Sequence, residues 1–250
     1  MSPDTPGLST TVKFESYSRP ESDPGKNLPG PVGSASESPG RHPSVMQLQR
    51  MNELIDGHSA LLFDLDGTLI DTMPLHYRAY AEVFARRGFS LQEAHFQAAI
   101  GGPAAEAIPK FLASLGVENA GAADVLAIHQ EKKDAFDALL ALSSPARLPA
   151  AELLNRARGT KKIALVSSGN RRGVTAILAS VGWKDVFDVV ISGDDVARGK
   201  PDPEGYRMAA AALNVRPDQC LVIEDTDAGL MSGRAAGMAV LDVALLAAQP

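Results

Sequence analysis

Two aspartates stand two positions apart at the end of an apolar run. The run 61–63 leads into Asp64, and Asp66 follows after a single leucine and precedes a glycine. An apolar run that stops in this way is typical of a buried strand that ends at the edge of a sheet. Two carboxylates at such an edge repel each other unless a cation or a shared proton compensates them. The spacing therefore indicates a chemical function for Asp64 and Asp66.

Three further groups of polar residues follow predicted strands later in the chain. They are Ser167-Ser168-Gly169-Asn170, Lys200-Pro201 and Glu224-Asp225. Carboxylates supply the oxygen ligands that Mg²⁺ prefers, and Mg²⁺ commonly bridges carboxylate and phosphate. A carboxylate can also attack phosphorus, while lysine, hydroxyl and turn N–H groups can bind the phosphoryl oxygens. Each group alone is common as a structural feature, but the four together point to metal-assisted phosphoryl transfer at Asp64.

The elements that would position these groups alternate between strand and helix. Strands are predicted at 60–64, 162–167, 186–192, 220–224 and 238–241, and helices between them at 150–158, 174–181, 203–213 and 228–236. This alternation predicts a parallel sheet with helices on both faces. Ligands of such sheets bind beyond the carboxyl ends of the strands. The predicted fold class is therefore α/β, with a Rossmann-like parallel-sheet core.

The segment 73–144 has helical periodicity and no strand pattern. Helices are predicted from about residue 73 to Arg87, from 104 to 115 and from 122 to 142, the last with an apolar stripe that Lys132 interrupts. Gly88 is a plausible end for the first of them. We interpret 73–144 as a small all-helical cap, inserted after the first strand of a core that comprises 45–72 and 145–250.

The first 44 residues have a different composition from the rest. Half of them are Pro, Ser or Gly, which predicts a disordered tail, with order beginning near Val45. The formal net charge of −6 argues against binding to nucleic acid or to an anionic membrane, and no apolar run is long enough to span a bilayer. We expect a cytoplasmic monomer, with organellar targeting by the tail left open. Cys220, the single cysteine, reads as a buried apolar residue.

The four polar groups, in this order, resemble the motifs of the haloacid dehalogenase-like hydrolases. The matching stretches are 63–69, 167–169, 200–201 and 224–226, and the resemblance covers residues 58 to 245. The helical segment resembles the cap of the branch that contains beta-phosphoglucomutase and many sugar phosphatases. Within that branch, residues 224–243 are most similar to bacterial fructose-1-phosphate and related sugar phosphatases.

The resemblance implies a role for each matching residue. Asp64 would be the nucleophile and a metal ligand. Asp66 would protonate the leaving alcohol, then deprotonate the attacking water, and would bind Mg²⁺ through its backbone carbonyl. Asp225 would complete the protein ligands of the metal. Glu224 would either bind the metal directly or hold the residues that do. Phosphate and substrate binding would fall to Thr68, His76, Ser167, Ser168, Gly169, Asn170 and Lys200.

Several of these roles have structural alternatives. The hydroxyl of Thr68 could orient Asp66 or simply close the turn. His76 could face the substrate or be a helix-surface histidine. Asp71 and Thr72 stand where a helix begins and are expected to cap it.

The expected activity is hydrolysis of a small phosphorylated metabolite, a sugar phosphate, with Mg²⁺. The second aspartate favours phosphate chemistry over dehalogenation, because a halide needs no acid to leave. A phosphosugar mutase of the beta-phosphoglucomutase type is the nearest alternative. The cap loop 100–106 weakens it, since Ala104 stands about where the mutase has an arginine, although Arg171 and Arg172 could substitute. A non-catalytic phosphate-binding regulator is a further alternative.

Overall fold

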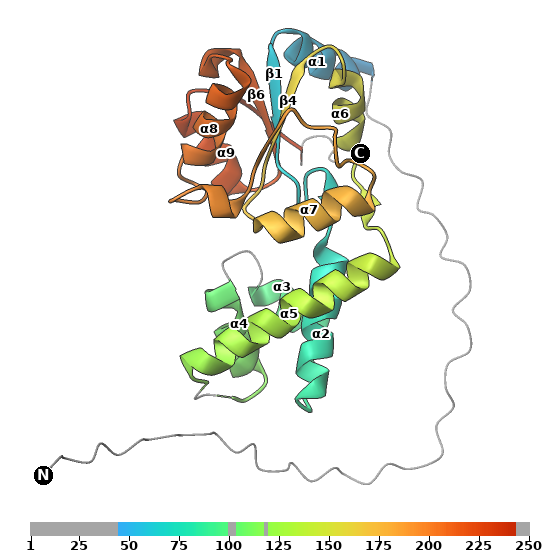
Figure 1. Ribbon diagram of the computed structural model, residues 1–250, viewed down its shortest axis with the longest axis vertical. Helices are drawn as coiled ribbons and strands as arrows, with labels where there is room; N and C mark the ends of the chain where they lie inside the picture. Colours follow the sequence, from blue (N-terminus) through green and yellow to red (C-terminus); the bar gives the residue numbers. More distant parts are fainter. Residues whose placement is uncertain (1–44, 100–103, 118–119, 244–250) are drawn as a thin grey trace, which may run out of the picture. The chain divides into compact units, whose positions relative to one another are not determined.

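The computed structural model describes residues 45–99, 104–117 and 120–243. Their main feature is a five-stranded sheet in the order β5-β4-β1-β6-β7, with every neighbouring pair parallel (Figure 1). The strands are β1 (Ala60–Phe63), β4 (Lys162–Val166), β5 (Val189–Ile191), β6 (Cys220–Glu224) and β7 (Ala239–Asp242). Because β1 is central and parallel to both neighbours, the predicted strand ends at 64, 167 and 224 meet at one edge. The predicted fold class is confirmed.

Alternate residues of β1 supply the two faces of the sheet. Leu61 and Phe63 join one buried cluster with residues of α1 (Val45–Asp56), α6 (Ala151–Ala157) and α7 (Arg171–Ser180). Ala60 and Leu62 join another with residues of α8 (Glu204–Leu213) and with Ala236 and Met238, which follow α9 (Asp227–Ala235). Figure 1 shows α8 and α9 on one side of the sheet and α1 and α6 on the other. A strand buried on both faces explains why its sequence is apolar throughout.

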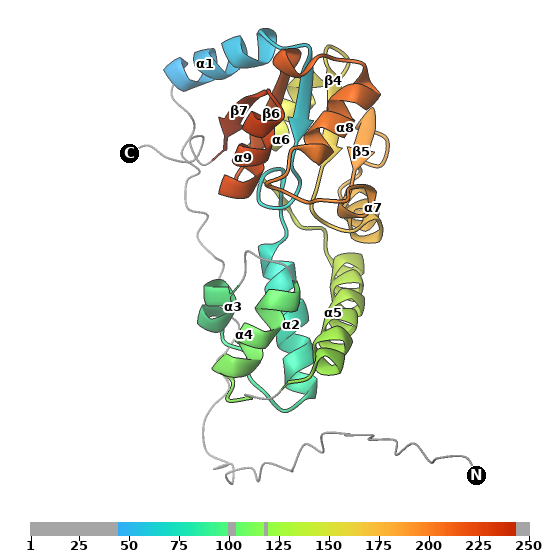
Figure 2. The ribbon, with the colours of Figure 1, turned by 90° about the vertical axis from the view of Figure 1, so that its left-hand side faces the viewer.

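Four helices occupy the segment between β2 (Ile70–Asp71) and β3 (Ala146–Arg147), a short antiparallel pair. They are α2 (Met73–Arg86), α3 (Glu93–Ala99), α4 (Ala104–Ser114) and α5 (Ala122–Leu142), and Figure 2 shows them gathered together. Their shared core is aromatic: Phe96 stacks on Phe111, and Tyr80 and Phe84 meet Phe111 edge-on. In α2, for example, buried residues recur at three- and four-residue intervals, which places them on one face of the helix. These buried faces pack against one another.

The structure adds detail that the sequence did not predict. Helix α3 and the pair β2–β3 were not expected, since each is too short to give a clear periodic signal. Helix α7 begins at Arg171 instead of residue 174, because the side chain of Asn170 accepts a hydrogen bond from Gly173 N at 2.9 Å and caps it. Strand β5 is shorter than predicted, and two 3₁₀ turns, η1 (Gly193–Asp195) and η2 (Pro217–Gln219), follow or precede strands.

Some predictions fall outside the part of the chain that the structure describes. The tail 1–44 and the cap-loop positions 100–103 are among them, so the predicted disorder and the predicted substrate-facing loop stay predictions. The core and cap boundaries also stay an interpretation. Among the described helices, none has the length and apolarity needed to cross a membrane.

Candidate active site

Asp64, Lys200 and Glu224 come together at the carboxyl ends of β1 and β6. The ammonium group of Lys200 donates to Asp64 Oδ1 at 2.5 Å, to Glu224 Oε1 at 2.6 Å and to the carbonyl of Val166 at 3.0 Å. All three charged side chains are at most 10% exposed. Charge-assisted hydrogen bonds of this kind are strong, and an unpaired charge in such a buried place would be strongly destabilising. Lys200 is therefore held directly beside the predicted nucleophile.

Glu224 uses both carboxylate oxygens to organise its surroundings. Oε1 accepts from Lys200 and from the hydroxyl of Tyr206 at 3.0 Å. Oε2 accepts from the backbone N–H of Asp225 and of Thr226, each at 3.1 Å, and from the Thr226 hydroxyl at 3.0 Å. The carboxylate also needs Gly229, because a Cβ there would lie 1.8 Å from Oε1. Glu224 thus fixes Lys200 on one side and the turn that carries Asp225 on the other.

The two threonines near the aspartates each donate a hydrogen bond to a carboxylate of the site. The Thr72 hydroxyl does not cap α2 but donates to Asp66 Oδ1 at 2.6 Å. The Thr68 hydroxyl donates to Asp225 Oδ1 at 2.7 Å, and does not orient Asp66. Burial raises the pKa of Asp66, and the Thr72 hydrogen bond opposes this by favouring the ionised form. The sequence did not reveal this contact of Thr72 with Asp66, because a threonine just before a helix is also expected as a helix cap.

Asp64 and Asp225 offer a fit for a hard divalent cation. One carboxylate oxygen from each of Asp64, Glu224 and Asp225 lies within 4.8 Å of the others. Burial raises the pKa of Asp64 to about 8, with Glu224 and Asp66 adding to the effect and Lys200 opposing it. A cation would reverse that shift by compensating the crowded carboxylates. Because both oxygens of Glu224 already accept protein hydrogen bonds, Asp64 and Asp225 are the better candidates for direct ligands, with Glu224 supporting them.

Gly67 allows Asp225 to approach the first motif. Its φ of +87° lies in the region that favours glycine, and a Cβ at this position would lie 2.3 Å from Asp225 Oδ2. The glycine that follows the aspartate pair in the sequence is thus required both by its backbone conformation and by this contact.

The loop after β4 places the next group of predicted residues. Ser167 is buried, and its Oγ accepts a hydrogen bond from Gly169 N at 3.0 Å. Asn170 uses its side-chain oxygen to cap α7, while Ser168 is exposed. A side-chain hydrogen bond from Ser167 also acts to lower the pKa of Asp66, so its hydroxyl already meets that carboxylate, and a phosphoryl oxygen would be an alternative acceptor. The structure brings Ser167 and Lys200 to the same edge of the sheet, and it gives Asn170 a structural role as well.

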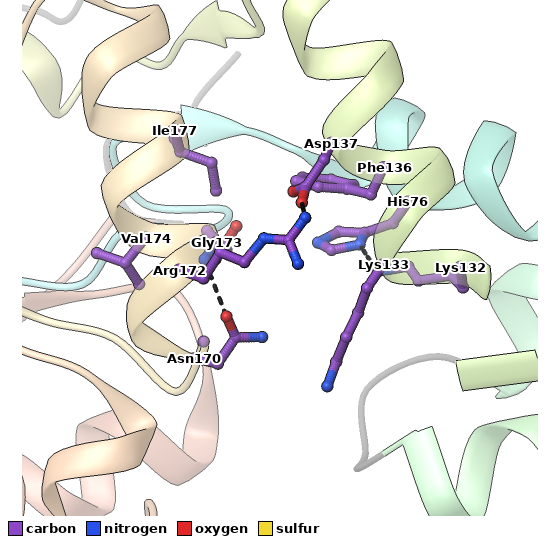
Figure 3. A pocket seen from close by; sticks show the side chains of 12 residues that line it. His76, Lys132, Lys133, Phe136, Asp137, Asn170, Arg172, Gly173, Val174 and Ile177 are labelled. Atoms are coloured by element: carbon purple, nitrogen blue, oxygen red, sulfur yellow. Dashed lines mark hydrogen bonds and ion pairs between the residues drawn. The ribbon is translucent and has the colours of Figure 1, made fainter. Parts of the chain in front are cut away.

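A cavity of about 110 Å³ opens beside Asp66, lined mainly by α5, α7 and the loop before α7 (Figure 3). His76 lines it and stacks on Phe136, with ring centroids 4.6 Å apart. Its Nδ1 lies 2.6 Å from the ammonium group of Lys132. Burial, together with the charge of Lys132, lowers the pKa of His76 to about 3, so the neutral ring accepts this hydrogen bond.

Lys132 is the site residue that the sequence reading missed. It lines the same cavity, where burial lowers its pKa to about 8 while Asp66 and Asp137 act in the opposite direction. Its ammonium group also lies 4.9 Å from the ring centre of Phe136. The sequence did give one indication of this role, because Lys132 interrupts the apolar stripe of its helix. A lysine on the buried face of a helix is rare unless its charge is paired.

Arg171 and Arg172, expected to replace a missing cap arginine, point to different partners. Arg171 forms an ion pair with Asp195 and donates to the carbonyl of Val190, away from the cavity lining. Arg172 lines the cavity and forms an ion pair with Asp137 on α5 at 2.5 Å. Only Arg172 is therefore placed to meet a ligand in this cavity.

Comparison with known proteins identifies the family. The model of the haloacid dehalogenase-like hydrolases matches residues 58–237. The chain belongs to this family. The predicted membership is thus confirmed, and the paired aspartates, the loop after β4, Lys200 and Glu224-Asp225 all lie within the matched region of this haloacid dehalogenase-like hydrolase.

Three relatives show where within the family the similarity lies. Fructose-1-phosphate phosphatase YqaB of Escherichia coli is 32% identical over 193 residues, which cover 77% of this chain and 100% of YqaB. A phosphorylated carbohydrates phosphatase of Thermotoga maritima is 34% identical over 179 residues, covering 72% of this chain and 82% of the relative. The crystal structure of CbbY from Rhodobacter sphaeroides with phosphate superposes with a TM-score of 0.63 and 32% identity, covering 73% and 84% of the two chains.

Proposed function

We propose that this protein is a Mg²⁺-dependent phosphatase that hydrolyses a sugar phosphate through an aspartyl-phosphate. The observation that carries the proposal is the pairing of two differently held carboxylates. Asp64 accepts from Lys200, whereas Asp66, two residues on, accepts from Thr72 and lines the cavity. Two acidic groups in different environments can divide the roles of nucleophile and acid–base catalyst.

In the proposed first step, a carboxylate oxygen of Asp64 attacks the phosphorus atom. The bond from phosphorus to the ester oxygen breaks, and Asp66 gives its proton to that oxygen, so the leaving group departs as an alcohol. Burial raises the pKa of Asp66, and this shift favours the protonated form that the acid role requires.

In the second step, Asp66 takes a proton from a water molecule. The oxygen of that water attacks the phosphorus of the aspartyl-phosphate, the bond to Asp64 breaks, and inorganic phosphate leaves. Both aspartates then regain their starting states. Thr72 supports this step because its hydrogen bond favours the ionised form of Asp66 that accepts the proton.

Charge on the phosphoryl oxygens would be met by Lys200, by the Ser167 hydroxyl and by N–H groups of the turn after β4. Asp64 and Asp225, supported by Glu224, would hold Mg²⁺, and the backbone carbonyl of Asp66 stays a proposed ligand. When bound, Mg²⁺ would supply positive charge to the nucleophile and the transferring phosphoryl group. Lys200 alone already binds two carboxylates, so it does not neutralise the site by itself.

A sugar phosphate is the proposed substrate because two relatives are named for phosphorylated sugars or carbohydrates, and because the cavity beside Asp66 is lined by polar and aromatic groups. The mutase alternative is not better supported, although solved structures named as beta-phosphoglucomutases are also similar to this chain. No arginine or lysine occurs between Phe89 and Pro109, where the cap of a mutase would hold a second phosphate.

Phosphate release from a panel of sugar phosphates, with and without Mg²⁺, tests the proposal. We expect release that depends on Mg²⁺ and that is lost in Asp64→Asn. Conversion of beta-glucose 1-phosphate to glucose 6-phosphate without net phosphate release would favour the mutase. Metal-dependent phosphate binding without turnover would favour a regulator instead.

A further inference from the structure

One wall of the cavity beside Asp66 carries an ion pair that the proposed mechanism does not use. Asp137 on α5 and Arg172 on α7 both line this cavity, and Arg172 Nη2 lies 2.5 Å from Asp137 Oδ2. Figure 3 shows the guanidinium group reaching from α7 to Asp137 and lying beside the ring of His76. The pair is thus part of the surface that a leaving group would meet after its phosphate is bound near Asp64.

The two side chains retain hydrogen-bonding capacity beyond their own contact. A guanidinium group has five N–H donors and a carboxylate accepts up to four hydrogen bonds. The side chains of Arg172 and Asp137 are 68% and 26% exposed, so neither is sealed in by its partner. Donors and acceptors therefore stand side by side within the cavity.

Neighbouring hydroxyl groups of a sugar offer the complementary pattern, since each hydroxyl both donates and accepts. We propose that Asp137 and Arg172 recognise adjacent hydroxyl groups of the leaving group and so select polyhydroxylated phosphate esters. This inference rests on the proposed phosphatase function and adds to it the residues that choose the substrate.

The rest of the cavity suits the same ligand. The stacked rings of His76 and Phe136, with Val174 and Ile177, offer apolar surface to the C–H groups of a sugar. Lys133 and Asn170, labelled in Figure 3, add further polar groups to the lining of this cavity. A small aromatic leaving group has no hydroxyl groups for the ion pair to bind, so it makes a suitable comparison.

A purely structural role for the pair would give a different signature. An ion pair with one mostly exposed side chain contributes little to stability. If Asp137 and Arg172 only joined α5 to α7, their loss would change the turnover of every substrate in the same proportion. If they bind hydroxyl groups, their loss acts on one class of substrate.

The test compares two substrates in full-length wild type, Asp137→Ala and Arg172→Ala with Mg²⁺. For fructose 1-phosphate we expect KM to rise about tenfold in each variant, the effect of losing hydrogen bonds to a charged group, with kcat little changed. For p-nitrophenyl phosphate we expect KM to change much less than for fructose 1-phosphate in both variants. Arg216→Ala, which breaks the exposed Arg216–Asp218 pair outside the cavity, is the matched control and should leave both substrates unaffected.

Equal changes for the two substrates, or no change in either, would overturn the inference while leaving the phosphatase proposal standing. Wild-type hydrolysis of p-nitrophenyl phosphate without any of fructose 1-phosphate or other sugar phosphates would also overturn it. Failure of the wild type to hydrolyse p-nitrophenyl phosphate and every sugar phosphate of the panel would overturn both proposals together.

Discussion

The hydroxyl of Thr72 donates a 2.6 Å hydrogen bond to Oδ1 of Asp66. Thr72 is fully buried and stands immediately before α2, so this bond ties the proposed acid–base residue to the start of the helical segment. His76 and Lys132, which belong to the same helical segment, line the cavity beside Asp66. The environment of the acid–base residue is thus built from both the sheet edge and the helices.

Replacement of Thr72 by valine should therefore lower kcat about tenfold, because a hydrogen bond to a charged group is lost and the pKa of Asp66 rises further. Valine has nearly the same shape, so the fold should persist. Steady-state kinetics with a thermal melt checks both points. Thr175→Val, at an exposed threonine of α7, is the control. An unchanged kcat in Thr72→Val would mean either that Asp66 is not the acid–base residue or that Thr72 does not assist it.

Mg²⁺ should raise the melting temperature of the wild type, since a ligand that binds only the folded state stabilises it. Asp225→Asn should abolish this increase, and Thr68→Val should reduce it, because Thr68 holds Asp225. The increase should also be larger at pH 8.5 than at pH 6.5. Asp64, with its pKa raised to about 8, must lose its proton before it binds a cation. An increase that Asp225→Asn retains in full would place the cation elsewhere.

Gly229→Ala should lower kcat more than tenfold. The added methyl group would lie 1.8 Å from Glu224 Oε1, so the carboxylate that holds Lys200 must move. Gly199→Ala is the matched control, because a Cβ there meets no heavy atom within 4 Å in the described structure. Phosphate release by the two variants at the same protein concentration makes the comparison. Similar rates for both would show that the position of Glu224 does not govern catalysis.

His76 should make the wild type sensitive to acid. Its pKa is about 3 in the folded protein, because of burial and Lys132, and about 6.5 when unfolded, so the stability it supports is present above pH 6.5. This stability is lost as the pH falls below 6.5 toward 3, since the unfolded chain then binds the extra proton. Between pH 7 and pH 4.5 the melting temperature of the wild type should fall further than that of His76→Gln. Parallel falls in the two proteins would contradict the lowered pKa.

The sheet and most of the proposed site were predictable because their signals are local. An apolar run that ends in Asp64 and Asp66 marks a strand end, and parallel connections bring such ends to one edge. Lys200 and Glu224, separated from Asp64 by more than 130 residues, meet it for this reason. Family resemblance then supplied roles that spacing alone does not give.

The remaining contacts were not predictable because they depend on how particular side chains turn. Thr72 has the residue type of a helix cap, yet its hydroxyl faces Asp66. Lys132 interrupts the apolar stripe of α5, and only the structure shows that its ammonium group contacts His76. Tyr206, in an apolar helix, gave no sign that its hydroxyl binds Glu224. The ion pair of Asp137 and Arg172 joins two helices that no sequence pattern pairs.

The most direct test is phosphate release from fructose 1-phosphate by the wild type and by Asp64→Asn, each with Mg²⁺ and with the metal chelated. We predict turnover by the wild type with Mg²⁺ alone, and none above background by Asp64→Asn under either condition, because the variant lacks the nucleophile. Equal turnover by the two proteins, or wild-type turnover that chelation does not change, would contradict metal-assisted phosphoryl transfer through Asp64.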